Sequence, residues 1–257
     1  MALITFMSDF GTSDHYVAAV KARILSINPG LKIVDISHNI NQFDIGHGAY
    51  VLKSVFHDFP EGTIHLAAVD SQGIGKNKNI VLKIEDHFFV GADNGLFSML
   101  SEKDPSIIAE LHHSEEECPN FPAREVLAKA AAMLASGSNV QDVGNFTSEY
   151  NRLLSRQVKA TKKQISGNVI RVDHYGNLIT NIEEEVFNIL KKNRGYTVSF
   201  GREVMDRIST AYCDVEAGDC FISFNSLGYL EIGINKGNAS ELLGLSIDSP
   251  VQIFFSE

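Results

Sequence analysis

The first half of the chain alternates short apolar runs with stretches whose apolar residues recur at helical spacing. The runs 3–7, 31–36 and 63–69 are typical of buried strands, and the stretches 17–27 and 45–56 are typical of helices with one buried face. This β-α-β-α-β order favours a parallel sheet with helices on both faces.

More elements of the same kind follow in the first half. The apolar runs 80–84 and 88–90 predict two further strands, and the alanine-rich stretch 124–134 predicts a helix. We therefore expect residues 1–150 to form an α/β domain with a mostly parallel sheet.

The pattern then changes twice. Residues 151–164 are polar and locally basic, which predicts a connector. After it, hydrophobic and polar positions alternate with a period of two, and short strands with glycine turns are typical of a small antiparallel barrel or sandwich. We expect residues 165–257 to form this all-β domain, with strands at 169–173, 196–200, 220–224, 229–234 and 251–255.

Composition excludes several classes of function. A net charge of −10 argues against a nucleic-acid binder and against a polybasic membrane patch. No apolar run approaches the roughly 18 residues of a spanning helix, and the first residues lack the charged start of a signal peptide. The three cysteines are an odd, sparse set with no short-spaced pair, which suggests a reducing compartment, so we expect a cytoplasmic protein.

Known cofactor and metal motifs are missing from the sequence. It contains no GxGxxG, no GxxxxGK[ST], no HExxH and no CxxC. We therefore expect neither a bound cofactor nor a metal site.

Two aspartates stand at the carboxyl ends of predicted strands, where open α/β sheets bind ligands. The carboxylate of Asp9 is able to accept hydrogen bonds from both hydroxyls of a ribose, although it is also placed to cap the next helix. Asp70 precedes the glycine-containing loop 71–75, whose N–H groups are able to face a substrate. An ordinary strand-exit turn is the alternative for Asp70.

The second half carries two polar turns. Residues 173–177 read Asp-His-Tyr-Gly-Asn, and their carboxylate, amide and aromatic ring are suited to holding the ammonium and carboxylate of an amino acid. A simple hairpin turn explains the same residues, and residues 225–229 have the same ambiguity.

Together these segments resemble the S-adenosyl-L-methionine (SAM) hydroxide adenosyltransferases, a family related to the fluorinating and chlorinating enzymes. The resemblance covers nearly the whole chain in order and spacing. The segments that carry it are 8–11 (SDFG) with 14–18, 33–40 (IVDISHNI), 65–70 (HLAAVD), 93–96 (DNGL), 172–182 (VDHYGNLITNI), 225–232 (NSLGYLEI) and 235–239 (NKGNA).

The resemblance implies a homotrimer that binds SAM, as a substrate, between the N-terminal domain of one subunit and the C-terminal domain of its neighbour. It implies that Asp9 holds the ribose diol, that Asp173 and Ser226 hold the methionine end, and that Asn177 lies near adenine. Tyr212 stacks on adenine if the alignment takes a one-residue gap. Other matched positions expected to bind substrate are Asp14, Asn94, Tyr175 and Asn235.

The reaction implied is attack of water or hydroxide on the ribose C5′ carbon, which releases methionine and gives adenosine. Asp70 matches the aspartate that prepares the water. The family arginine is replaced by Lys78, or by Lys76 if the gap is placed differently, and the family histidine is replaced by Pro122. Lysine does not reproduce the bidentate geometry of arginine. His112 or His113 is the alternative source of an imidazole.

These departures leave three hypotheses. The first is a SAM hydrolase with an altered water-activating set, in which Asp70 and Lys78 are the catalytic residues. The second is a non-catalytic protein that binds SAM or adenosine as a sensor or by sequestration. The third is a halide-using variant, for which Ala123 lacks the hydroxyl of the fluorinating relatives but leaves space for chloride.

Overall fold

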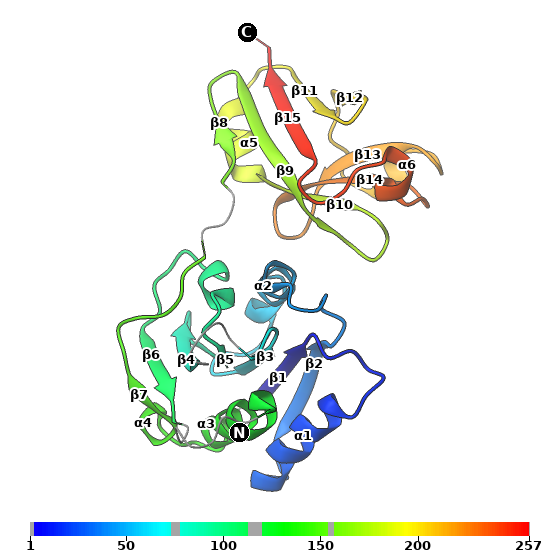
Figure 1. The fold of residues 1–257 in the computed structure, drawn as a ribbon. Coiled ribbons are helices and arrows are strands. Elements are labelled where there is room, and N and C mark those ends of the chain that lie inside the picture. The colour runs from blue at the N-terminus through cyan, green and yellow to red at the C-terminus, as the bar shows by residue number, and fades with distance from the viewer. Residues whose placement is uncertain (1–2, 73–77, 113–119, 154–156, 257) are drawn as a thin grey trace. The chain divides into compact units, whose positions relative to one another are not determined.

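A computed structural model describes residues 3–72, 78–112, 120–153 and 157–256 (Figure 1). The chain folds as two compact units, Met1–Leu154 and Ser155–Glu257. Within the described residues no helix is both long enough and apolar enough to cross a membrane.

Unit 1 is built on a seven-stranded sheet with the order β2-β1-β3-β5-β4-β6-β7. The first four strands in that order are parallel, and the pairings β5–β4, β4–β6 and β6–β7 are antiparallel. The expected mostly parallel sheet is therefore wrong in part: the sheet is mixed, because a short hairpin joins β4 to β5. The strands are β1 (Leu3–Ser8), β2 (Lys32–Ser37), β3 (Ile64–Ala68), β4 (Asn79–Ile84), β5 (His87–Ala92), β6 (Ile107–Leu111) and β7 (Gly144–Phe146).

Helices cover both faces of this sheet (Figure 1). Ile4 and Phe6 of β1 pack into a core with α1 and α3, whereas Met7 belongs to a second core with α2. Because β1 is buried on both faces, four of its six residues are apolar, and they do not alternate with exposed polar residues. The helices are α1 (Tyr16–Ile27), α2 (Ile45–Lys53), α3 (Ala128–Ala135) and the short α4 (Val140–Val143).

Strand β2 was expected to be buried and is instead an exposed edge strand. Its residues are exposed or half-buried, and Val34 keeps 40% of its accessible surface. An apolar run at a sheet edge has the same sequence pattern as a central strand, so the run alone did not distinguish the two.

Unit 2 is an eight-stranded, wholly antiparallel sheet with a barrel-like curvature, in the order β12-β11-β15-β9-β10-β14-β13 with β8 beside β9. It is not purely β, because two short helices, α5 (Glu184–Lys191) and α6 (Ala239–Leu243), close its core. The strands are β8 (Lys159–Ala160), β9 (Gln164–Val172), β10 (Leu178–Glu183), β11 (Tyr196–Phe200), β12 (Glu203–Met205), β13 (Cys220–Phe224), β14 (Tyr229–Ile234) and β15 (Pro250–Phe255).

Candidate active site

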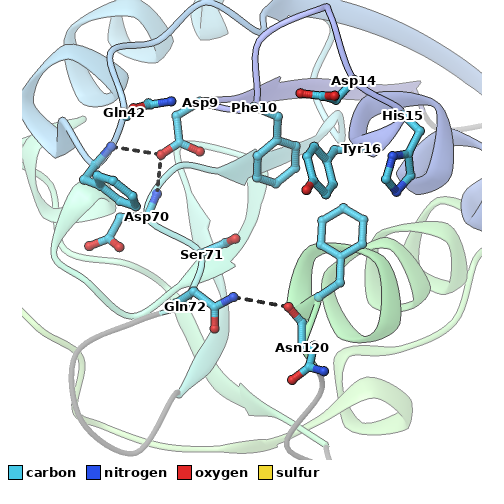
Figure 2. Close-up of a pocket in the computed structure, with 12 residues that line it drawn as sticks. Asp9, Phe10, Asp14, His15, Tyr16, Gln42, Asp70, Ser71, Gln72 and Asn120 are labelled. Carbon is cyan, nitrogen blue, oxygen red and sulfur yellow. Dashed lines mark hydrogen bonds between the residues drawn. The ribbon is translucent and has the colours of Figure 1, made fainter.

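The ends of β1 and β3 bring Asp9 and Asp70 together. The two strands are parallel neighbours, so their carboxyl ends lie at the same edge of the sheet. Oδ2 of Asp9 accepts hydrogen bonds from the backbone N–H of Asp70 at 3.1 Å and from that of Phe43 at 3.0 Å (Figure 2). Sequence analysis singled out both aspartates, and the fold places them in direct contact.

A cavity of about 650 Å³ opens at this edge. Three carboxylates line it, and none of the described residues that line it is a lysine or arginine, which favours a cationic ligand. The lining residues are Asp9, Phe10, Asp14, His15, Tyr16, Gln42, Phe43, Asp70, Ser71, Gln72, Asn120 and Phe121.

One wall of the cavity is aromatic. The rings of Phe10, Tyr16 and Phe121 contact one another with centroids 5.5–5.9 Å apart. Phe121 and Pro122 lead into a π-helical turn, Ala123–Leu127, ahead of α3, and such turns are frequent at functional sites. The wall offers apolar surface beside the three carboxylates, as a nucleoside with a charged tail would require.

A chain of polar side chains, buried at Ser8 and His38 and exposed at Asp35, supports the Asp9 loop from behind. Ser8 Oγ lies 2.7 Å from Nδ1 of His38, whose Nε2 lies 3.3 Å from Asp35, and the carbonyl of His38 accepts from Gly11 N–H at 2.8 Å. Burial lowers the pKa of His38. Gly11 has φ of +70°, which suits glycine at this tight turn.

Asn94, expected to bind substrate, lies behind the cavity rather than on its wall. Its side chain is buried, donates to the carbonyls of Val69 and Asp70 at 2.9 and 3.3 Å, and accepts from Leu96 N–H at 3.2 Å. Its side chain therefore braces the Asp70 segment.

Lys78 is also absent from the cavity wall. Its Nζ lies 2.9 Å from Glu110 on β6, and this hydrogen bond raises the pKa of the exposed ammonium. Of the alternative candidates, His112 does not line the cavity either, and its Nε2 lies 3.3 Å from Oδ1 of Asn145. Lys76 and His113 lie outside the described residues.

The one histidine among the described lining residues is His15, which the sequence analysis missed. Figure 2 shows it across the cavity from Asp70, with the rings of Phe10 and Tyr16 between them.

In unit 2 the predicted residues 173–177 form the turn between β9 and β10. Asp173 Oδ1 accepts from the N–H groups of Tyr175 and Asn177 at 2.9 Å, and its Oδ2 accepts from the Asn177 side chain at 3.0 Å. Tyr175 is 75% exposed. These residues therefore form the predicted hairpin turn, and the exposed Tyr175 remains accessible to a ligand.

A buried glutamate that sequence analysis missed lies beside this turn. Glu231 on β14 accepts a hydrogen bond from the Tyr212 hydroxyl at 2.8 Å, and burial raises its pKa. Glu231 lies in the segment 225–232 that carries the family resemblance, but the alternating pattern of this strand did not reveal that its carboxylate is buried against the Tyr212 hydroxyl. Ser226 is exposed in the β13–β14 turn, and Asn235 donates to the Val215 carbonyl at 2.8 Å.

Within the part of the chain that the structure describes, no group of three His, Cys, Asp or Glu side chains is placed to hold a metal ion. The described wall of the unit 1 cavity offers carboxylates, amides, one imidazole and one serine hydroxyl beside aromatic rings.

Comparison with known proteins defines the class. Residues 4–144 match the sequence model of the SAM hydroxide adenosyltransferase N-terminal domain, and residues 167–252 match that of the C-terminal domain. The chain therefore belongs to the SAM hydroxide adenosyltransferase family.

Individual relatives agree with this assignment. The chain is 31% identical to an (R)-S-adenosyl-L-methionine hydrolase of Methanocaldococcus jannaschii over 98% of this chain and 96% of that one. It is 29% identical to a fluorinase of an Actinoplanes species over 91% of each. A crystal structure of an uncharacterized conserved protein from Thermotoga maritima matches with a TM-score of 0.88 and 31% identity, over 98% of this chain and 100% of that one.

Proposed function

We propose that this protein hydrolyses SAM to adenosine and L-methionine. The observation that carries the proposal is the contact of Asp9 with Asp70 in a cavity lined by three carboxylates and an aromatic wall. SAM presents the matching features: a ribose diol, a positive sulfonium and a flat base. The relatives named as SAM hydrolases support the same reaction.

In the proposed reaction, Asp70 accepts a proton from a water molecule that attacks the ribose C5′ carbon in line with the C5′–S bond. The new C–O bond forms as the C–S bond breaks, and the electron pair of that bond leaves with methionine as a neutral thioether. One proton is released overall. A negative nucleophile cancels the sulfonium charge in the transition state, so a site that excludes water favours the step.

The second catalytic candidate, Lys78, is not needed for this scheme. Its ammonium is already paired with Glu110, and Lys78 is not among the described residues that line the cavity. We therefore assign the contact with the attacking water to Asp70, and binding of the ribose to Asp9.

We further propose that unit 2 of a neighbouring subunit completes the site in a homotrimer in the cytoplasm. Asp173 and Ser226 would hold the methionine end, and Asn177 and Tyr212 would contact adenine. Light scattering tests the trimer. Mixing Asp9→Ala with Asp173→Ala subunits tests the shared site, because mixed trimers regain intact sites and activity only if each site uses two chains.

The direct test is incubation of the purified protein with SAM at neutral pH, followed by chromatography for adenosine and methionine. Asp70→Ala and a protein-free blank are the controls, since SAM decays spontaneously. Adenosine formed in excess of both controls supports the hydrolase. Adenosine formed no faster than in the Asp70→Ala control contradicts it.

A second candidate function is non-catalytic binding of SAM or adenosine. The observation that favours it is that the described wall of the cavity contains no arginine, and its histidine lies across the cavity from Asp70. Micromolar binding by calorimetry without turnover identifies this case. Chloride-dependent formation of a chlorinated adenosine identifies the halide-using alternative.

A further inference from the structure

The backbone of Asp70 is held from both sides by two other side chains. Its N–H donates to Oδ2 of Asp9 at 3.1 Å, and its carbonyl accepts from the Asn94 amide at 3.3 Å. The same Asn94 amide donates to the preceding carbonyl, that of Val69, at 2.9 Å. The two peptide groups that flank the Asp70 side chain are therefore both anchored.

The conformation that these bonds hold is unusual. Asp70 has φ of +44°, in the left-handed region that residues other than glycine rarely adopt. Phe43, whose N–H donates to the same Asp9 oxygen at 3.0 Å, has φ of +61°. Such conformations persist only where the surroundings impose them. One carboxylate oxygen thus fixes two left-handed residues from two different loops.

The two oxygens of Asp9 have separate tasks. Oδ2 accepts both backbone N–H groups, and hydrogen bonds to a charged acceptor are stronger than neutral ones. Oδ1 accepts no hydrogen bond from the described residues, and Figure 2 shows it turned away from both N–H groups. One oxygen therefore stays available to a ligand while the other holds protein backbone.

We propose that Asp9 is a positioning residue for Asp70 in addition to a ligand of the ribose, and that Asn94 is its partner on the opposite side of the peptide. This inference rests on the proposed hydrolysis. The direction of the Asp70 Cα–Cβ bond depends on the backbone angles that Asp9 and Asn94 impose. Release into a right-handed or extended conformation moves the carboxylate away from the attacking water. A misplacement of about 1 Å costs about 100-fold in rate.

The test separates ribose binding from positioning by deleting the ribose hydroxyls. Wild type and Asp9→Ala are assayed with SAM and with its 2′,3′-dideoxy analogue, and kcat and KM are measured separately. If Asp9 positions Asp70, Asp9→Ala lowers kcat about 100-fold with both substrates. If Asp9 only binds ribose, the mutation has no effect on the dideoxy substrate, and that result overturns the inference.

Three variants complete the experiment. Asp9→Asn keeps a carbonyl oxygen for both N–H groups, so it should restore most of the kcat on the dideoxy analogue. Asn94→Ala should lower kcat without changing the preference for ribose hydroxyls. Asp44→Asn alters the neighbouring carboxylate that caps α2, which accepts from His47 N–H at 2.9 Å, and should leave kcat unchanged.

A crystal structure of Asp9→Ala gives a readout that does not need turnover. Asp70 should leave the left-handed region, and a retained φ near +44° overturns the positioning role. If wild type does not hydrolyse SAM, the proposed function fails, and this structure still decides the inference about Asp9.

Discussion

A pair of buried histidines predicts how acid destabilises unit 1. His65, with no exposed surface, lies between Thr5 and His87: its Nδ1 is 2.7 Å from Thr5 Oγ1, and its Nε2 is 3.1 Å from Nδ1 of His87. Burial, with a smaller contribution from the nearby His87, lowers the pKa of His65 to about 3. An unfolded histidine has a pKa of about 6.5.

The sign and size follow from proton linkage. Between pH 6.5 and 3 the unfolded chain binds a proton at His65 that the folded chain does not, so the free energy of unfolding falls as the pH falls. The loss attributable to His65 is about 1 kcal/mol at pH 5.5 and about 3 kcal/mol at pH 4.5. Above pH 6.5 this contribution is constant.

The perturbation is His65→Gln, which removes the titrating group and keeps a polar side chain. Urea unfolding is followed by far-UV circular dichroism at pH 7.5, 6.5, 5.5 and 4.5 for both proteins. Taking the difference between wild type and variant cancels the titration of the carboxylates they share. Relative to pH 7.5, that difference should shift against wild type by about 1 kcal/mol at pH 5.5 and about 3 kcal/mol at pH 4.5. A difference that stays constant over this range refutes the reasoning.

Three further predictions concern other sites. Lys78→Met, which breaks only the exposed pair with Glu110, should lower kcat less than about tenfold, measured by adenosine formation; a loss near 100-fold would place this lysine at the reacting centre. Tyr212→Phe removes a hydrogen-bond donor to Glu231 and should lower the unfolding free energy of unit 2 by about 1 kcal/mol at pH 8. The loss should be smaller at pH 5, because burial raises the pKa of Glu231 and more of this carboxyl is protonated there. Equal losses at the two pH values, measured by thermal unfolding, would contradict this. Gly91→Ala places a Cβ 2.7 Å from a carbonyl oxygen of the neighbouring strand, so its unfolding free energy should fall by roughly 2 kcal/mol or more; unchanged urea unfolding would show that the sheet accommodates it.

The candidate site was partly accessible to sequence reasoning. Asp9 and Asp70 follow apolar strands, and parallel strands end at one edge of a sheet, so their proximity was predictable. The hydrogen bond from Asn94 to the Asp70 carbonyl was not predictable, because it depends on the backbone angles of a loop. The assignment of Lys78 as a catalytic residue stays a prediction, and its ion pair shows why chain position alone does not place a flexible cation.

The sequence by itself determined the division of this protein into two halves and its family. Hydrophobic periodicity and ordered motifs are local properties, so they can be read without a structure. It also determined the chemical types available, chiefly carboxylates at strand ends. Only the tertiary structure decided that the first sheet is mixed, that β2 is an exposed edge, and that one oxygen of Asp9 fixes two left-handed residues. The edge position of β2 and the two bonds to Asp9 depend on contacts between residues that are distant in sequence, and a local pattern predicts at most that such residues lie near each other, not which bonds they form.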